Sequence, residues 1–118
     1  MNLLAIGSKI TIRKICEEII DKVEIVNLVD FTNKNYLNWD LSRSNKVKYN
    51  SGDIEKIDTL IKSGLEDSDI VIVHSNTDIE TLFIAQKSKI DTKKNIFVIL
   101  DDLSFCLLYT SPSPRDRG

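Results

Sequence analysis

Four short apolar runs in this sequence each end in polar residues that could bind a ligand. If the runs are parallel strands, their carboxyl ends lie along one edge of a sheet, where open α/β sheets bind ligands at the point of strand-order reversal. The candidate binding residues are, in chain order, Gly7, Ser8, Lys9, Asp30, His74, Ser75, Asn76 and Thr77. We expect these residues to gather at one rim of the fold.

The turn Gly7-Ser8-Lys9 precedes an amphipathic segment. The start of a helix favours anions through its free amides and its dipole, and Lys9 adds a positive charge. A dinucleotide fingerprint needs three glycines at set spacing so that the backbone can approach a pyrophosphate. Only Gly7 is present, and Ile10 and Ile12 occupy much of the remainder. The turn is therefore either a phosphate-binding turn or a plain tight turn.

Asp30 lies about twenty residues beyond Gly7, the separation at which a ribose-binding acid follows the phosphate turn. Aspartates that end strands are also ordinary turn formers. Ribose binding and a structural turn are both compatible with this position.

His74 is the only histidine. It could act as a general base near neutral pH, or it could simply bond a neighbouring loop. The sequence has no Gly-x-Ser-x-Gly elbow that would place a nucleophile beside it. Asp101 and Asp102 could hold magnesium or form a solvated turn.

Two periodicities alternate along the chain and predict the fold. Apolar runs at residues 3–6, 24–29, 69–74 and 95–100 predict strands, and residues 46–49 could add a short edge strand. Apolar residues at three- and four-residue steps predict helices in 12–23, from Asp53 to Gly64, and from Thr77 onward. The alternation indicates the first half of a Rossmann-like, three-layer α/β domain with a mostly parallel sheet of four core strands and three helices.

The predicted helices carry recognisable start signals. Ser8 or Thr11 could cap the first helix, Asp53 the second, and Thr77 the third, where Glu80 completes a capping box. The buried stripe of the third helix is predicted to contain Ile79, Leu82, Phe83 and Ala85.

Residues 31–52 interrupt this rhythm with a long segment rich in Asn and Ser, in which Tyr36, Leu37 and Trp39 are the anchors. Loops this long are usually functional or mobile. The aromatic residues could pack the loop down, stack on a base or meet a partner chain.

Composition excludes several classes of protein. The chain has 118 residues, enough for one domain, and a net charge of −2 from interleaved acidic and basic residues, so we expect no nucleic-acid partner. The first apolar run is too short for a signal peptide or a membrane span, and we expect a cytoplasmic protein without a membrane partner. Cys16 falls on an apolar stripe and suggests a core thiol, and no Cys/His cluster suggests zinc.

Residues 106–116, CLLYTSPSPRD, resemble the translation of a sequencing-library adapter in one frame. We expect the natural sequence to stop near residue 105 because of this match. The expected organisation is a Rossmann-like domain fragment at 1–105 and an artefactual, disordered tail at 106–118.

Two stretches resemble tubulin-like proteins, including bacterial cell-division and phage members. Residues 1–8, MNLLAIGS, resemble the strand that leads into the nucleotide loop, and residues 64–73, GLEDSDIVIV, resemble the segment that leads into the signature loop. The position of that glycine-rich loop here reads HSNTD, without glycine. The resemblance implies a purine nucleotide, with Gly7 and Ser8 facing its phosphates and Ser75, Asn76 and Thr77 replacing the signature loop.

These observations lead to a nucleotide-binding-like domain that acts through binding or ligand-dependent assembly, with itself or a protein partner, rather than through turnover. An alternative is a non-catalytic interaction or scaffold domain that keeps the fold without the ligand. A third hypothesis is a hydrolase or transferase that uses His74 and Asp101.

Overall fold

The computed structural model describes residues 1–89 and 95–102 of the chain. The predicted tail at 106–118 and the expected end of the natural sequence near residue 105 lie outside the described residues. No helix in the described ranges is long and apolar enough to cross a membrane.

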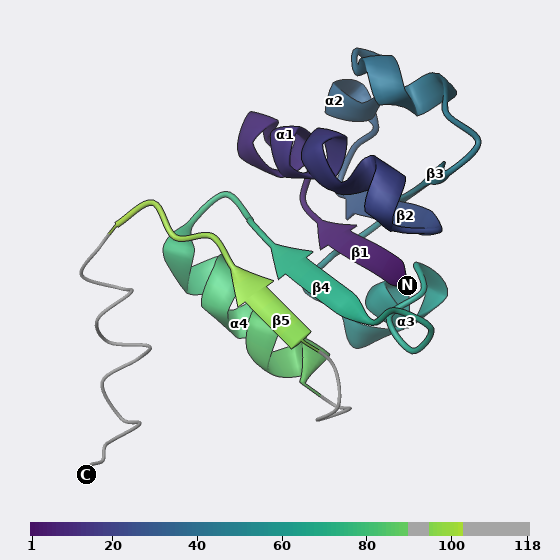
Figure 1. Cartoon of the computed structure of the whole chain (residues 1–118). Helices are drawn as coiled ribbons and strands as arrows, with labels where there is room; N and C mark the ends of the chain where they lie inside the picture. The colour runs from purple at the N-terminus through teal and green to yellow at the C-terminus, as the bar shows by residue number, and fades with distance from the viewer. Residues whose placement is uncertain (90–94, 103–118) are drawn as a thin grey trace, which may run out of the picture.

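A five-stranded parallel sheet organises the molecule, with strand order β3-β2-β1-β4-β5 (Figure 1). Helices link successive strands, so the chain has the predicted Rossmann-like α/β fold. The strands are β1 (Asn2–Ile6), β2 (Ile25–Asp30), β3 (Val47–Ser51), β4 (Ile70–Val73) and β5 (Asn95–Val98). The described helices are α1 (Ile10–Ile19), η1 (Ile20–Lys22), α2 (Lys34–Leu37), η2 (Asp40–Arg43), α3 (Ile57–Lys62) and α4 (Asp78–Ser88).

The strand predictions are confirmed, and the optional edge strand at 46–49 exists as β3. The described sheet therefore has five strands rather than four. Strand β5 stops at Val98, two residues before the predicted end at Leu100. Beyond Val98, the Ile99 amide still donates to Val73 O, and the amides of Asp101 and Asp102 are bound by Asp78 on α4.

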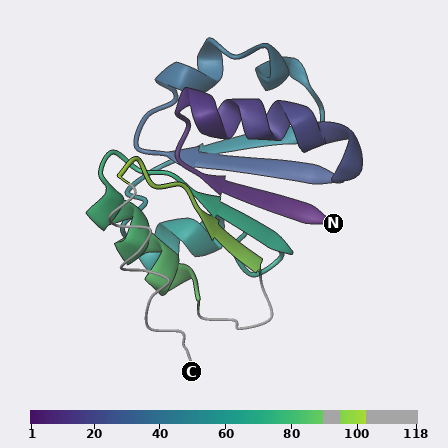
Figure 2. The same cartoon turned by 60° about the vertical axis from the view of Figure 1, so that its left-hand side comes forward.

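Helices cover the two faces of the sheet, with α1 and α2 on one side and α3 and α4 on the other (Figure 2). The alternation of side chains along β1 divides the core accordingly. Leu3 and Ala5 pack in the cluster that contains Ile12 of α1, whereas Leu4 and Ile6 pack in the cluster that contains Ile84 of α4. Strand β1, at the centre of the sheet, is therefore apolar on both faces, as a buried parallel strand requires.

The first predicted helix is divided into α1 and the short 3-10 helix η1, and its apolar stripe buries Ile12 and Cys16. No side chain caps α1, so the predicted caps Ser8 and Thr11 are both wrong. The Ser8 hydroxyl bonds Asp30 on the neighbouring strand instead, because the two strand ends lie side by side.

The second predicted helix, α3, begins at Ile57 rather than after Asp53, and no side chain caps it. The Asp53 carboxylate accepts a bond from the amide of Glu55, a local turn that competes with helix formation. The predicted stop at Gly64 is confirmed, since Gly64 has φ +103° immediately after the helix end.

The predicted cap of α4 is confirmed, and its predicted buried stripe is correct for Ala85, which is fully buried, but wrong for Ile79 and Phe83. The Thr77 hydroxyl accepts a bond from the Glu80 amide at 3.1 Å. Ile79 and Phe83 are 66% and 46% exposed. The helix buries a different stripe, on which Ile84 packs in the core and Asp78 bonds the amides of Asp101 and Asp102. The buried residues of α4 are Asp78, Thr81, Ile84, Ala85 and Ser88.

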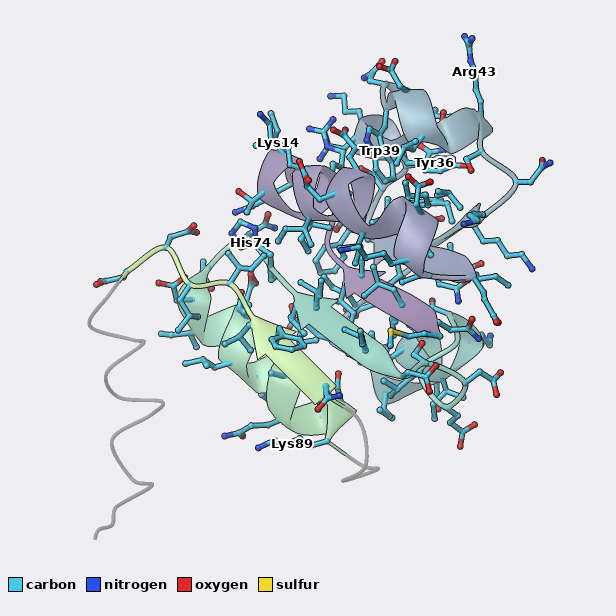
Figure 3. The ribbon with its side chains drawn as sticks, in the orientation of Figure 1. Lys14, Tyr36, Trp39, Arg43, His74 and Lys89 are labelled. Atoms are coloured by element: carbon cyan, nitrogen blue, oxygen red, sulfur yellow. The ribbon has the colours of Figure 1, made fainter. Side chains whose placement is uncertain are left out.

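The aromatic residues of the 31–52 segment pack it onto the domain (Figure 3). Trp39 is buried, and its Nε1 donates to Glu17 Oε2 at 2.7 Å. Tyr36 stacks on Tyr49 of β3 with ring centroids 4.7 Å apart. Leu37, the third predicted anchor, is exposed. Of the three roles considered for the aromatic residues, packing the loop down accounts for Trp39 and Tyr36.

Candidate functional site

The candidate residues that follow β1, β2 and β4 meet where the strand order reverses. Strand β1 lies between β2 and β4, and all three run in the same direction (Figure 1). The chain proceeds from β1 toward β2 on one side and later returns to β4 on the other, and such a switch point leaves a crevice at the carboxyl ends. The structure thus brings Gly7, Asp30 and His74 to one edge, as predicted.

Gly7 allows the turn after β1 to lie against the end of β4. Its amide donates to Val29 O at 2.7 Å, and the His74 amide donates to Ile6 O at 3.0 Å. Gly7 has φ +107°, and a Cβ at this position would lie 2.1 Å from His74 O. No other residue type fits here without backbone movement, because the conformation and the space both exclude a side chain.

The predicted phosphate turn and the predicted ribose-binding acid are in direct contact. Ser8 is buried, and its hydroxyl donates to Asp30 Oδ2 at 2.5 Å. The Phe31 amide donates to Asp30 Oδ1 at 2.7 Å, and Asn35 Nδ2 donates to Ser8 Oγ at 3.3 Å. Each carboxylate oxygen accepts one of these bonds and can accept another, so Asp30 is held in place and can still bind ligand hydroxyls.

Tyr49 lies beside Asp30 and supports the same strand end. Its hydroxyl donates to Thr32 O, and Asp30 O lies 3.5 Å away. Burial, followed by the negative charge of Asp30, raises the pKa of Tyr49 to about 12. The phenol therefore stays a hydrogen-bond donor at neutral pH.

The start of α1 lies at this edge of the sheet without a side-chain cap. Lys9 is the N-cap residue, in an extended conformation. Arg13, one turn into the helix, donates from Nε to Ser8 O at 3.0 Å and so places a second positive charge near the turn. Uncapped amides and two cations form a site that suits a phosphate.

Lys9 and Ile12 stand where the dinucleotide fingerprint would have its second and third glycines. Ile12 is fully buried against β1. The bulk at these two positions restricts how closely a pyrophosphate can approach the backbone. Of the residues predicted to add bulk there, Ile12 is buried and Ile10 is exposed. The geometry favours a single phosphate group over a pyrophosphate.

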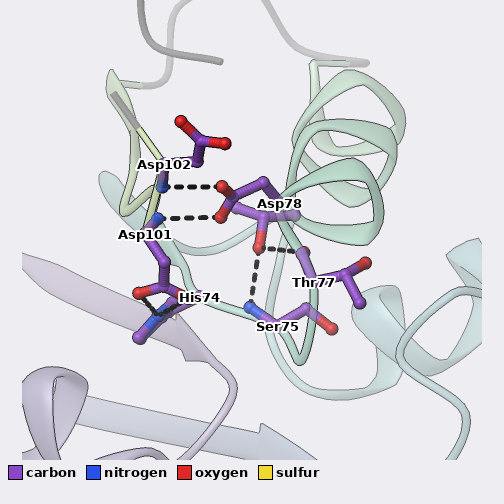
Figure 4. A network of polar contacts seen from close by, with 7 residues as sticks. His74, Ser75, Thr77, Asp78, Asp101 and Asp102 are labelled. Atoms are coloured by element: carbon purple, nitrogen blue, oxygen red, sulfur yellow. Dashed lines mark hydrogen bonds and ion pairs between the residues drawn. The ribbon is translucent and has the colours of Figure 1, made fainter. Parts of the chain in front are cut away.

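His74 contacts the Asp101 carboxylate at the end of β4 (Figure 4). It is 4% exposed, and its Nε2 lies 3.2 Å from Asp101 Oδ1 and 3.5 Å from Oδ2. Its other ring nitrogen, Nδ1, is buried and has no hydrogen-bond partner among the described residues. His74 is thus bonded to a neighbouring loop as the structural interpretation predicts, and one polar atom is left over.

The other candidates after β4 mainly build the start of α4. The Ser75 amide donates to Thr81 Oγ1 at 2.9 Å, and the Thr81 hydroxyl donates to Thr77 O at 2.9 Å. Ser75 Oγ donates to Glu80 Oε1 at 3.4 Å. Asn76 is exposed. These bonds occupy Ser75 and Thr77, so the structure gives both a role in forming the turn.

Asp78, like Arg13 and Tyr49, is a residue at this edge that was not among the predicted site residues. Its carboxylate is buried and accepts the Asp101 amide at Oδ1 and the Asp102 amide at Oδ2, both at 2.8 Å (Figure 4). The only signal in the sequence was an acid in the first turn of a helix, which is normally read as a dipole effect. Within the described residues, no group of three or more His, Cys, Asp or Glu side chains could hold a metal ion.

Solved structures share this fold, while no protein-family model and no curated protein matches the sequence. The Kef CTD of Shewanella denitrificans in its AMP-bound form matches with a TM-score of 0.75 and 13% identity over 100% of this chain. Saccharopine dehydrogenase (L-Glu forming) from Saccharomyces cerevisiae, in its apo form, matches with a TM-score of 0.62 and 24% identity over 90% of the chain. Pen from Bacillus thuringiensis matches with a TM-score of 0.64 and 18% identity over 80% of it.

None of these three proteins is tubulin-like, so the predicted kinship stays a prediction. The chain spans 36% of Pen, 72% of the Kef CTD and 23% of the dehydrogenase. At identities this low, the structural matches show only a shared fold, which is the Rossmann-like α/β fold.

Proposed function

We propose that this domain binds a nucleotide with one phosphate group at the start of α1 and acts through binding rather than turnover. The observation that carries the proposal is the contact between the Gly7–Ser8 turn and Asp30 at the switch point. It unites an uncapped helix start, two cations and a fixed carboxylate, which are the groups that recognise a phosphate and a ribose. The AMP-bound form of the similar Kef CTD supports a mononucleotide.

The purine mononucleotide AMP is our candidate ligand. Its phosphate would meet the amides of α1 and the charges of Lys9 and Arg13. Its ribose hydroxyls would donate to the free lone pairs of Asp30, which already holds Ser8 and the Phe31 amide.

Binding of AMP, ATP, GTP and NAD to the full chain, measured by isothermal titration calorimetry, tests this proposal. We expect AMP to bind, and we expect Asp30→Ala to weaken its binding about tenfold or more because the ribose hydroxyls lose a charged acceptor. Asp21→Ala is the matched control, since Asp21 is exposed in η1 and precedes β2 at the opposite edge of the sheet.

Lys9→Ala separates recognition of the phosphate from recognition of the nucleoside. We expect it to weaken AMP binding and leave adenosine binding unchanged. Absence of binding by all four nucleotides at millimolar concentration would remove the proposal.

A second candidate function is a protein-interaction domain, favoured by exposed apolar side chains. Ile79 and Phe83 lie one turn apart on the outer surface of α4, and Phe97 on β5 is 56% exposed. Phe97 alternates along β5 with Ile96 and Val98, which pack against the core cluster on the α4 side, so Phe97 lies on the opposite face of the sheet. The exposed apolar pair on α4 is therefore the candidate contact surface. Sedimentation velocity with and without AMP tests it, and it also tests ligand-dependent self-assembly. A monomer at all concentrations and with every ligand would contradict assembly.

A further inference from the structure

The imidazole of His74 has one ring nitrogen that the protein orients and does not use. The ring is buried, Nε2 faces the Asp101 carboxylate, and Nδ1 has no partner among the described residues. Buried polar atoms are nearly always hydrogen-bonded, and an exception calls for an explanation such as a bound group. Nδ1 is the only buried side-chain nitrogen or oxygen atom in the described residues that lacks a partner.

The Asp101 carboxylate determines what Nδ1 can do. An ionised carboxylate only accepts hydrogen bonds, so in the neutral ring the hydrogen lies on Nε2. Nδ1 then carries a lone pair and is an acceptor. A group that satisfies it must donate from O–H or N–H.

The backbone of Asp101 is held in place by the rest of the domain, while its carboxylate is 60% exposed. Its amide donates to the buried Asp78 carboxylate, which also binds the next amide, and Ile99 N donates to Val73 O at 2.9 Å. These bonds tie the segment after β5 to both α4 and β4. The orientation of the ring is therefore set before any ligand arrives, the condition for a selective contact.

His74 lies on the side of the sheet where the nucleotide is proposed to bind. Ile72, two residues earlier, packs in the cluster that contains Ile12 of α1, and alternate residues of a strand share a face. Figure 3 shows His74 at the end of β4, near the start of α1. Its carbonyl oxygen is the atom that Gly7 approaches.

We propose that His74 Nδ1, oriented by Asp101, accepts a hydrogen bond from the bound nucleotide and makes the site selective for a ligand with a donor at that point. This inference rests on the proposed nucleotide function. A nucleotide offers two kinds of donor, a ribose hydroxyl and the amino group of the base. A buried water on Nδ1 is the competing occupant.

Two substitutions at His74 separate the ring nitrogens. Asn places a polar atom near the position of Nδ1, whereas Gln reaches the position of Nε2 and leaves Nδ1 unreplaced. We expect His74→Gln to weaken AMP binding about tenfold and His74→Asn to weaken it less. Thermal unfolding without ligand shows whether each variant is folded.

Asp101→Asn tests the same contact without altering His74. An asparagine amide can donate to Nε2, which moves the ring hydrogen to Nδ1 and converts the acceptor into a donor. We expect this variant to lose AMP affinity to a degree similar to His74→Gln. It also keeps the inference testable if a substitution at the buried ring prevents folding.

Titration with AMP analogues identifies the ligand group that donates to His74 Nδ1. Wild-type protein is titrated with AMP, 2′-deoxy-AMP, 3′-deoxy-AMP and IMP, which lacks the amino group. We expect one analogue to bind about tenfold more weakly than AMP, and we expect this difference to vanish in His74→Gln and Asp101→Asn.

Equal AMP affinity of wild type and His74→Gln, or a difference between analogues that persists in the variants, would overturn the role of His74 and indicate a buried water. Wild-type protein that binds no nucleotide would instead overturn the proposed function itself.

Discussion

Two strand-to-helix turns, β1–α1 and β4–α4, lie side by side at the switch point. They differ in whether a side chain caps the helix that follows. At α4 the protein supplies its own groups: Thr77 caps the helix, and Asp78 in the first turn bonds the chain after β5. At α1 no side chain caps the helix, and the N-cap residue is the cation Lys9.

The difference shows which of the two helix starts is available to a ligand. Both have the dipole that attracts anions, but at α4 the Glu80 amide is already bonded to the Thr77 hydroxyl. The start of α4 already has carboxylates close to it, which would repel a phosphate. Of these two helix starts, only α1 combines uncapped amides with positive charge, from Lys9 and Arg13, while Asp30 is already bonded to Ser8. The comparison therefore supports the proposed phosphate site at α1 and a structural role for α4.

Gly7→Ala is the change with the largest expected effect, because it disrupts the close approach of Gly7 to the His74 carbonyl, where the two turns meet. The added Cβ would lie 2.1 Å from His74 O in a backbone conformation of φ +107°. We expect a loss of about 3–5 kcal/mol in the free energy of unfolding, measured by urea denaturation. Gly52→Ala is the control, since its Cβ would meet only the Thr59 side chain, at 3.0 Å. Equal losses in the two variants would show that the turn can rearrange.

Asp78→Ala removes the carboxylate that satisfies two backbone amides after β5. We expect a loss of about 2–3 kcal/mol in the free energy of unfolding, since two donors lose a charged acceptor. Asp78→Asn keeps one carbonyl acceptor and should lose less. If both variants unfold at the urea concentration of wild type, the bonds from α4 to the end of β5 contribute no stability.

Removing the cap of α4 and adding a cap to α1 tests the difference between the two helix starts directly. Thr77→Ala removes a cap from α4 and should cost about 1 kcal/mol in the free energy of unfolding. Lys9→Asp supplies a cap to α1 and should add about 0.5–1 kcal/mol while weakening AMP binding. Urea denaturation and calorimetry measure the two effects. A Lys9→Asp variant that is more stable and binds AMP as wild type does would contradict a phosphate at α1.

The smallest expected effect concerns pH on the α1 side of the sheet. Burial, followed by the charge of Glu17, raises the pKa of the Cys16 thiol from 9.0 to about 12. A raised pKa stabilises the fold fully below the unfolded pKa, and this contribution is lost as pH rises from 9 toward 12. Tyr49 acts in the same direction between pH 10 and about 12.

We therefore expect the urea midpoint of wild type to fall between pH 9 and 11. Cys16→Ala should reduce the slope of that fall, because it removes one of the two groups. An identical slope in the variant would show that Cys16 does not contribute to the alkaline loss.

Features that depend on a few consecutive residues could be predicted from the sequence. The four apolar runs form strands, Gly64 ends α3, and Thr77 caps α4, as predicted. Each of these outcomes depends on local conformational preference. The caps predicted at Ser8 and Asp53 failed because each side chain had a better partner, Asp30 across the sheet for Ser8 and the nearby Glu55 amide for Asp53.

In the candidate site, too, some features could be predicted from the sequence and others depend on contacts between distant residues. The rule that ligands bind at strand ends selected Gly7, Asp30 and His74, and the structure places all three at one edge. The contact between Ser8 and Asp30 and the orientation of His74 by Asp101 join residues 22 and 27 positions apart. Spacing along the chain does not reveal which of two lone pairs or ring nitrogens such a contact will occupy.

By itself, the sequence determined the Rossmann-like sheet and the edge where its polar turns gather, because apolar periodicity fixes which faces must be buried. Tertiary structure decided which helix start stayed open. Asp78 lies on the buried side of α4 and bonds the chain after β5, whereas Ile79 and Phe83 are exposed. Such choices depend on donors and acceptors that meet only after the strands have paired.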